Sequence, residues 1–176
     1  FYVGMKGYMD LRRAPAEAYE VSVTAQKWSW QFKHTNGCEQ YGTLYVPAGR
    51  PVRLTMRSMD VLHALFIPAF RVKQDIVPGR VTTLWFEAVK PGEYDLFCAE
   101  YCGKDHSRMA ARVHVLSEAE FETKLAECAD FLDKYTDEDL DQAGAIYYKR
   151  LCASCHTLDG TTSTGPSWDT VWEKTV

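Results

Sequence analysis

Four of the six cysteines in this chain lie in two short motifs that also contain a histidine. Residues 98–109 have the form C-x3-C-x3-H-x2-M, and residues 152–156 have the form C-x-x-C-H. Thiols and imidazoles at such spacings are typical of cofactor binding, more than of a disulfide framework. Any fold of this chain must therefore hold two cofactor-binding segments in place.

The other two cysteines, Cys38 and Cys128, stand alone in the sequence. We interpret them as buried or free thiols, because an isolated cysteine commonly behaves as a small core residue. A long-range disulfide between them is the alternative.

The composition is that of a folded chain: of 176 residues, 46% are hydrophobic and 13% are aromatic, which is enough to build a core. No apolar run approaches the roughly 18 residues that would span a bilayer. The opening residues pass from aromatic and apolar side chains to Arg12 and Arg13, which suits the exit of a membrane helix or an ordinary exposed segment. We take residues 1–14 as a lead-in that follows a membrane helix.

The net charge of −4 is unevenly distributed. Residues 117–141 contain ten acidic and two basic residues, a local charge of 2 − 10 = −8, which leaves +4 for the rest of the chain. Such a run is usually the solvated face of a helix, and a docking surface for a basic partner is the alternative. We expect no nucleic-acid partner.

From Tyr19 to Leu116 the pattern is that of short β-strands separated by turns. Strand-like residues recur in segments 19–25, 28–32, 52–57, 81–86, 93–97 and 111–115. The parity of the apolar alternation changes between the first two segments, so we expect a bulge or break near Gln26 and Lys27. This spacing of strands and turns predicts a mainly β fold, either a sandwich or a Greek-key barrel.

After Leu116 the apolar period becomes helical. Ser117 and Glu120 have the spacing of a capping box. One predicted helical stripe then contains Phe121, Leu125, Cys128 and Leu132. A second helix, capped by Thr136 or Asp137 and with Leu140, Ala143, Tyr147 and Leu151 on one face, is expected to run directly into Cys152.

The first cysteine motif, together with His63 upstream, offers two thiolates, two imidazoles and one thioether. This ligand set suits copper in electron transfer, whereas a single blue-copper site needs one cysteine and structural zinc has no use for methionine. Two cysteines with three residues between them can instead each bridge two metal ions and let them share one electron. Taken singly, His63 would be a core histidine and Met109 a packing residue. The joint spacing is what indicates a metal site.

Residues 58–63 and 98–109 resemble the copper A domain of subunit II of haem–copper cytochrome c oxidases, and the resemblance extends over about residues 15–116. It implies a cupredoxin-like Greek-key barrel with a dinuclear copper centre. The implied ligands are Cys98 and Cys102 bridging both coppers, His63 and Met109 completing one copper, and His106 with the backbone carbonyl of Glu100 completing the other.

The same resemblance implies roles for residues that do not bind copper. The Glu100 side chain would reach a magnesium ion at the boundary with the catalytic subunit. Residues 70–80 resemble the segment that faces that subunit. Residues 27–32 resemble the family's aromatic strand, in which the first tryptophan, Trp28, is where electrons enter. On its residue type alone, Trp28 would be a core or edge aromatic.

The second cysteine motif, Cys152-Ala-Ser-Cys155-His156, is the pattern of c-type haem attachment. The thiols form thioethers to the porphyrin vinyl groups, and the adjacent histidine ligates the iron. A pentapeptide of this kind can also occur by chance or bind zinc.

The residues around this motif resemble class I cytochromes c. Gly144 and Tyr148 match the glycine and the aromatic residue of the first helix. Gly165-Pro166 matches the loop in which the proline carbonyl accepts a hydrogen bond from the proximal histidine, here His156. The family's second axial ligand is a methionine well downstream, and no methionine follows His156. We therefore expect the cytochrome domain to continue beyond Val176.

Together the resemblances imply the electron-transfer subunit of a respiratory cytochrome c oxidase, an oxidoreductase complex in which this chain only carries electrons. The implied path runs from cytochrome c, or another periplasmic donor, through haem c to copper and on to the oxygen-reducing subunit. The implied partners are catalytic subunit I and the other oxidase subunits, with a respiratory supercomplex as a further option. The implied place is the outer, periplasmic face of a bacterial cytoplasmic membrane.

The domain organisation that follows has four parts. They are the lead-in (1–14), the copper A domain (15–116), an acidic helical linker (117–135) and the start of an all-α cytochrome c domain (136–176).

Two alternatives belong to other classes of protein. Nitrous oxide reductase carries a similar two-copper domain, but its carbonyl-donating position resembles a tryptophan where this chain has Glu100, and it lacks the haem pentapeptide. A free-standing electron shuttle or copper-delivery module would need neither the segment 70–80 nor a magnesium ligand at Glu100.

Overall fold

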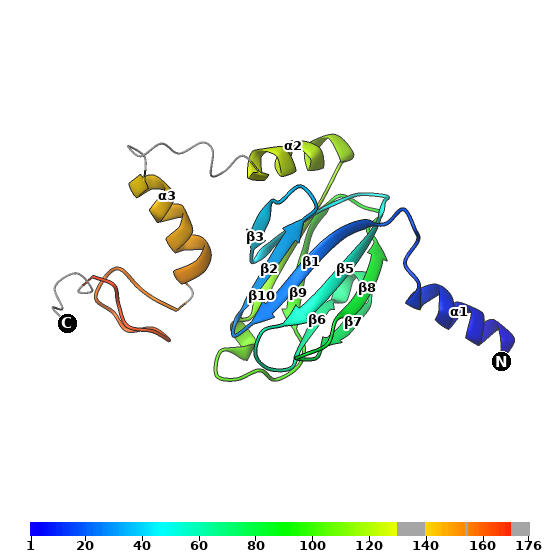
Figure 1. Ribbon diagram of the computed structural model, residues 1–176, viewed down its shortest axis with the longest axis horizontal. Coiled ribbons are helices and arrows are strands. Elements are labelled where there is room, and N and C mark those ends of the chain that lie inside the picture. Colours follow the sequence, from blue (N-terminus) through cyan, green and yellow to red (C-terminus); the bar gives the residue numbers. More distant parts are fainter. Residues whose placement is uncertain (130–139, 154, 170–176) are drawn as a thin grey trace. The chain divides into compact units, whose positions relative to one another are not determined.

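The computed structural model describes residues 1–129, 140–153 and 155–169, which divide between two compact units, Phe1–Asp130 and Phe131–Val176. The first unit is built on two five-stranded β-sheets (Figure 1). The mainly β fold that the strand pattern predicts is therefore confirmed, in the form of two sheets.

The first sheet has the strand order β3-β2-β1-β5-β8. Its strands are β1 (Tyr19–Gln26), β2 (Ser29–His34), β3 (Glu39–Tyr41), β5 (Pro51–Ser58) and β8 (Thr82–Glu87). Strands β1 and β5 pair in parallel, with Val23 opposite Met56, and the other pairs are antiparallel.

The second sheet has the strand order β4-β10-β9-β6-β7. Its strands are β4 (Thr43–Pro47), β6 (His63–Ile67), β7 (Val72–Ile76), β9 (Gly92–Cys98) and β10 (Ala110–Leu116). Strand β10 pairs in parallel with β4 and antiparallel with β9. The neighbouring strands β9 and β6 are those that carry residues of the predicted metal site.

The core follows from the alternation of buried and exposed residues along the strands. Strands β1 and β5 each bury every second residue, as a strand with one face toward a core must do. The buried apolar residues from both sheets include Val21, Val23, Leu54, Met56, Leu44, Val46, Leu96 and Val113. Each fully buried side chain of this size stabilises the fold by about 1.5–3 kcal/mol relative to exposure.

The predicted break near Gln26 and Lys27 is a tight hairpin. Gln26 pairs with Ser29 across antiparallel strands β1 and β2, so Lys27 and Trp28 form the turn between them. The chain reversal explains the change of parity, and no bulge is needed. Trp28 therefore lies at a turn, whereas Trp30 and Phe32 lie in the core.

Sequence reasoning missed strands β3, β4, β6 and β7. Strand β3 has three residues, and β7 is mostly polar. Strand β6 is apolar after His63, and four of its five residues are buried, so it shows no alternation.

The lead-in forms helix α1 (Tyr2–Arg12), which sequence reasoning did not assign. Its last turn is attached to β8 by a hydrogen bond of 3.0 Å that Trp85 Nε1 donates to the carbonyl of Leu11. Within the described part of the chain, no helix combines the length and apolar character needed to cross a bilayer.

Helix α2 (Glu118–Ala129) begins with the predicted capping box. The Ser117 amide donates to Glu120 Oε2 at 3.1 Å, and the Glu120 amide donates to Ser117 Oγ at 3.4 Å. Phe121 and Leu125 are buried, which confirms the described part of the helical stripe. Leu132 lies outside the described residues. The acidic side chains of this helix are exposed, as expected for a solvated face.

A disulfide joins Cys38 to Cys128, with 5.3 Å between their Cα atoms and a sequence separation of 90. The interpretation of these cysteines as unpaired thiols is therefore wrong, and the alternative holds. The helical stripe carries Cys128 toward the sheets, where it is partly buried against the core.

The described part of the second unit contains helix α3 (Leu140–Tyr147) and the turn η4 (Tyr148–Cys152). These two elements run continuously into Cys152, as the sequence predicts. The predicted cap residues Thr136 and Asp137 lie outside the described residues. The described loop that follows contains Gly165 and Pro166.

Candidate metal centre

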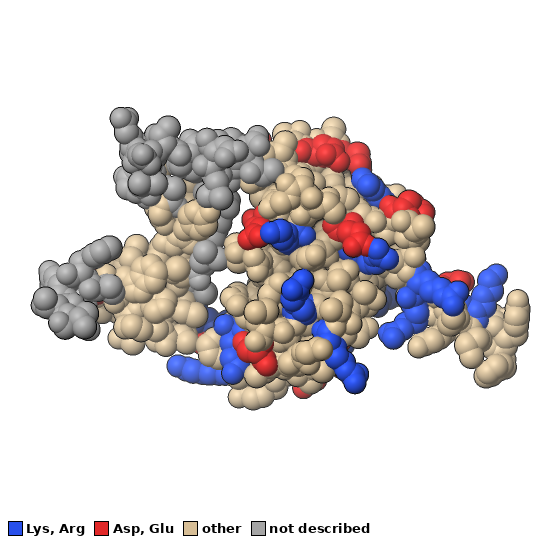
Figure 2. All heavy atoms as spheres, viewed as in Figure 1, with Lys and Arg blue, Asp and Glu red and all other residues tan. Residues whose placement is uncertain are grey.

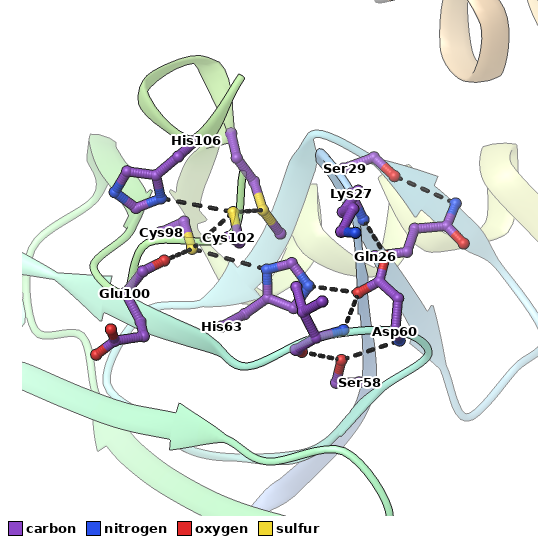
Figure 3. Close-up of polar contacts among 12 residues, drawn as sticks. Gln26, Lys27, Ser29, Ser58, Asp60, His63, Cys98, Glu100, Cys102 and His106 are labelled. Atoms are coloured by element: carbon purple, nitrogen blue, oxygen red, sulfur yellow. Dashed lines mark hydrogen bonds and ion pairs between the residues drawn. The ribbon is translucent and has the colours of Figure 1, made fainter. Parts of the chain in front are cut away.

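Three segments of the first unit bring the predicted metal ligands together (Figure 3). His63 begins β6, and Cys98 ends the neighbouring strand β9. The loop that follows contains Cys102, and the short helix η2 (His106–Arg108) ends at Met109, just before β10. The paired strands and this loop therefore fix all five side chains from one end of the second sheet.

The donor atoms lie in a chain of short separations. Cys98 Sγ is 3.8 Å from His63 Nδ1 and 3.8 Å from Cys102 Sγ. Cys102 Sγ in turn is 3.5 Å from His106 Nδ1 and 3.8 Å from Met109 Sδ. The backbone carbonyl oxygen of Glu100 is 3.3 Å from Cys98 Sγ. The two cysteine sulfurs are thus at the centre, with one imidazole on each.

These separations fit a metal site. The donor atoms of His63, Cys98 and Cys102 all lie within 4.8 Å of one another, and the three residues are buried. With metal–sulfur bonds of about 2.3 Å, two sulfurs on one tetrahedral metal ion are separated by about 3.8 Å. The thiol and imidazole donors, with a thioether beside them, are soft and intermediate ligands that suit copper.

The cluster polarises its own thiols. Burial opposes ionisation of Cys98, but hydrogen bonds led by that from His63 outweigh burial and lower the pKa of this thiol. Burial and the nearby charge of Cys98 raise the pKa of Cys102. Cys98 is therefore the more readily ionised of the two thiols, and binding a metal ion through both sulfurs would release the proton of Cys102.

Sequence reasoning missed the role of Asp60, which contacts the ring nitrogen of His63 that faces away from the cysteine sulfurs. Its Oδ1 lies 2.8 Å from His63 Nε2 and accepts the amide of Val61 at 2.6 Å, while its Oδ2 accepts the amide of Lys27 at 2.7 Å. Burial disfavours the charged carboxylate, but these hydrogen bonds lower the pKa of Asp60 overall. Its position three residues before a predicted histidine ligand was the signal that could have indicated this supporting role.

Trp28 and Glu100 lie beside the cluster in different ways. The Trp28 ring packs against Gly103, where an added Cβ would be 3.3 Å from ring atom Cζ2. Within the described residues, the buried Trp28 Nε1 has no hydrogen-bond partner. The Glu100 side chain points away from the cysteine sulfurs, while its carbonyl oxygen faces Cys98 (Figure 3).

The second cysteine motif has its own ordered surroundings. His156 Nδ1 donates to the carbonyl of Pro166 at 2.8 Å, the contact expected from the sequence. The Tyr148 hydroxyl donates to the carbonyl of His156 at 2.7 Å, and the Gly165 amide donates to the carbonyl of Cys155 at 2.7 Å. Cys152 and Cys155 are both half-buried. The loop at 165–166 therefore contacts both the His156 ring and the backbone of the motif.

The fold and the first cluster together define a class: a cupredoxin-like β-sandwich with a cysteine, histidine and methionine site at one end. Residues 32–116 match the family model described as "Cytochrome C oxidase subunit II, periplasmic domain". This segment is therefore similar to the periplasmic domain of cytochrome c oxidase subunit II.

Individual relatives agree with this. The "Alternative cytochrome c oxidase subunit 2" of Bradyrhizobium diazoefficiens is 32% identical over 148 residues, which cover 66% of this chain and 53% of the relative. The "Cytochrome c oxidase subunit 2" of Alkalihalophilus pseudofirmus is 30% identical over 158 residues, which cover 89% of this chain and 46% of the relative. This chain thus spans about half the length of these relatives.

A solved structure shows the same fold. The periplasmic domain of subunit II of cytochrome oxidase from Bradyrhizobium japonicum superposes with a TM-score of 0.63 at 28% identity, covering 66% of this chain and 96% of that chain. The relatives are subunits of haem–copper oxidases, which are oxidoreductase complexes.

Proposed function

We propose that this chain is the electron-transfer subunit of a respiratory cytochrome c oxidase on the outer face of a bacterial cytoplasmic membrane. It would relay electrons from cytochrome c through a covalent haem c to a dinuclear copper A centre and on to the oxygen-reducing subunit. The observation that carries the proposal is the convergence of two thiols, two imidazoles and a thioether within a domain of the subunit II kind.

Five side chains and one carbonyl would hold the copper pair. Cys98 and Cys102 would bridge both ions, because their sulfurs occupy the centre of the cluster. The resemblance would place His63 and Met109 on one ion and His106 with the Glu100 carbonyl on the other. Each of these donors lies within 3.8 Å of one of the two sulfurs. The bound pair would supply a one-electron carrier whose geometry changes little, since buried strand ends hold the ligands.

The second unit would carry the haem. Cys152 and Cys155 would form the thioethers, and His156 would be the axial ligand through Nε2, because its Nδ1 already donates to Pro166. A side chain at position 165 would meet the His156 ring, with Cβ only 2.5 Å from Cε1, so glycine is required for this packing.

Three further assignments belong to the proposal. Trp28, which packs against the loop residue next to Cys102, would be where electrons enter the copper domain. The Glu100 side chain would reach a magnesium ion shared with the catalytic subunit, and residues 70–80 would face that subunit. The disulfide between Cys38 and Cys128 supports an oxidising compartment such as the periplasm.

The copper assignment is tested by electron paramagnetic resonance of the copper-loaded chain. One unpaired electron shared by two copper nuclei gives hyperfine splitting from two equivalent nuclei, and this is the expected spectrum. Cys98→Ser and Cys102→Ser should abolish it or leave a one-copper signal, whereas the matched double variant Cys38→Ser/Cys128→Ser should retain it. Splitting from one copper nucleus in the parent protein would rule out the shared centre.

The haem assignment is tested by expression in a cell that has a haem-attachment system. Haem should remain on the chain through denaturation and should be lost on unfolding of Cys152→Ser/Cys155→Ser. Release of all haem from the denatured parent would contradict a covalent link, without affecting the copper assignment.

A further inference from the structure

Two grooves meet where α1 ends, on a surface of the first unit that the metal centre does not use. One, of about 610 Å³, lies between the end of α1 and strands β7 and β8. The other, of about 620 Å³, lies between Leu11 and residues of η1 (Pro68–Phe70), β8 and β9. Leu11, Val72 and Trp85 line both grooves, so the two share a wall.

The first groove is basic. None of its twelve lining residues is acidic, and five are cationic: Arg12, Arg13, Arg53, Arg71 and Lys73. Figure 2 shows lysine and arginine side chains gathered where α1 meets the sheets. Among the ion pairs within the described residues, Arg53 is the one member of this set with an acidic partner, Glu20. The groove therefore presents several uncompensated positive charges to an anion.

One of these cations occupies a backbone conformation that arginine does not favour. Arg71 has φ 55° and ψ 35°, the left-handed region, where it ends the short helix η1. A glycine there would be free of the Cβ penalty. An arginine at such a position suggests that its side chain serves a purpose other than stability.

The second groove is largely apolar. Its walls include Phe70, Phe86 and Val89, and the Phe70 ring packs 4.9 Å from that of Phe86 and 5.0 Å from that of Tyr94. Helix α1 beside it buries none of its residues. Large apolar side chains exposed at this end of the chain are Phe1, Tyr2, Val3, Met5, Tyr8 and Leu11. The apolar groove and the basic groove thus lie together at the end of α1, where Leu11 lines both.

We propose that the two grooves form one site for an anionic phospholipid of the phosphatidylglycerol type. The phosphate-bearing head group lies among the cations of the basic groove, and the first part of an acyl chain lies along Phe70 and Val89 in the apolar groove. A ligand with one negative head and one apolar tail is the chemistry that matches both surfaces. The site does not depend on the copper and haem assignments. Because it includes the start of the segment 70–80, a bound lipid would lie at the boundary between this domain and the catalytic subunit that the segment is proposed to face.

Binding of the chain to lipid vesicles tests the basic groove. The chain should sediment with vesicles of mixed phosphatidylglycerol and phosphatidylcholine more than with phosphatidylcholine alone. Arg71→Gln/Lys73→Gln should weaken this binding about thirtyfold, since each cation at a lipid surface contributes about a factor of five. The control Lys33→Gln/Arg112→Gln makes the same change of charge on strands β2 and β10 and should have little effect. Equal losses in the two double variants would mean general attraction to charge and would overturn the site.

Two single variants separate binding from folding. Arg71→Gly should weaken vesicle binding while leaving the free energy of unfolding unchanged or raising it, because glycine relaxes the left-handed backbone. Val89→Asp should weaken binding more than Val81→Asp, which places the same charge at another exposed valine outside the groove. Vesicle binding that none of these variants changes would show that the grooves do not hold the lipid and would overturn the site.

Inorganic phosphate distinguishes a lipid from a free anion. Added phosphate at constant ionic strength should leave vesicle binding intact, because the acyl contact is absent from phosphate. Complete displacement of the chain from the vesicles would show that the groove recognises phosphate alone and would overturn the lipid proposal.

Discussion

Oδ1 of Asp60 lies 2.8 Å from Nε2 of His63, whose other ring nitrogen faces the sulfur of Cys98. The second carboxylate oxygen accepts the amide of Lys27, the residue before Trp28. One carboxylate therefore fixes the orientation of a proposed copper ligand and also ties the β1–β2 turn to the metal cluster.

Removal of this carboxylate should weaken copper binding. Metal-bound histidines depend on the group that their second nitrogen contacts, and loss of that group typically costs about 10- to 100-fold in affinity. We expect Asp60→Ala to fall in this range and Asp60→Asn, which keeps an acceptor, to lose less. Competition with a copper chelator measures both.

The matched control is Asp95→Ala, which removes a carboxylate that pairs with Arg112 on the outer surface of the second sheet. It should leave copper affinity near the parent value. The role given to Asp60 is wrong if its alanine variant holds copper as tightly as this control.

Gly103 should be required for the position of Trp28. Its φ is 122°, and an added Cβ would lie 3.3 Å from the tryptophan ring. Gly103→Ala should therefore lower both stability and copper loading, because Gly103 directly follows Cys102. Gly49→Ala is a matched control, since Gly49 also has a positive φ, 68°, but open space around it.

A double-variant cycle separates backbone strain from ring contact. In a Trp28→Ala background, the extra cost of Gly103→Ala over Gly49→Ala should shrink, because the ring that the Cβ meets is absent. Urea unfolding and copper titration measure this. If this extra cost is the same in both backgrounds, glycine is needed at position 103 for its backbone conformation and not for the contact with the Trp28 ring.

The sequence predicts that the five side chains of the candidate metal centre lie close together, because their spacing reflects the chemistry directly. C-x3-C-x3-H-x2-M lies in one continuous loop, so its members are close whatever the rest of the fold does. The placement of His63 beside this segment depends only on the pairing of β6 with β9. The resemblance, more than the pattern, supplied the pairing of each ligand with a copper ion.

The supporting residues could not be identified in the same way, because their positions depend on contacts distant in the sequence. Asp60 meets Lys27 only because residues 27 and 28 form a hairpin turn, and the change of parity there was equally consistent with a bulge. Prediction of the disulfide required the knowledge that α2 packs onto the sheets, because the two cysteines are 90 residues apart in the sequence. Neither contact leaves a local pattern.

A buried histidine should make the stability of the first unit depend on pH. His34 is 2% exposed, and its ring nitrogens contact the Tyr19 hydroxyl at 3.0 Å and Gln40 Oε1 at 3.3 Å. Burial lowers the pKa of His34, and the hydrogen bond with Gln40 offsets this only in part. The folded protein therefore keeps the ring neutral at pH values where the unfolded chain binds a proton.

The direction of the pH dependence follows from the lower pKa of His34 in the folded state. Above about pH 6.5 the ring is neutral in both states and contributes no pH dependence. As the pH falls below this value, the unfolded chain gains the proton first, so the free energy of unfolding should fall until the pH reaches the lowered pKa of the folded state. Urea titrations at a series of pH values should show a shallower decline for His34→Gln. A decline as steep as that of the parent would assign the dependence to other groups.

The disulfide should contribute substantially to the stability of the first unit. It links Cys38 beside β3 to Cys128 in α2, and closing a loop of this length restricts the unfolded chain. We expect Cys38→Ser/Cys128→Ser to lower the free energy of unfolding by about 2–4 kcal/mol. Urea unfolding of the metal-free chain measures this without interference from ligand binding at Cys98 and Cys102.

Two comparisons assign that loss to the covalent bond. Reduction of the parent should lower its stability to that of the double variant, and reductant should not change the variant further.

Phe121→Ala, which removes the largest buried side chain of α2, tests the other attachment of the helix and should cost about 3–5 kcal/mol. Because Phe121 and the disulfide hold the same helix, their effects should not be additive: with the disulfide reduced, α2 can move away more easily, so Phe121→Ala should cost less. Full additivity would mean that the two contacts stabilise the unit independently.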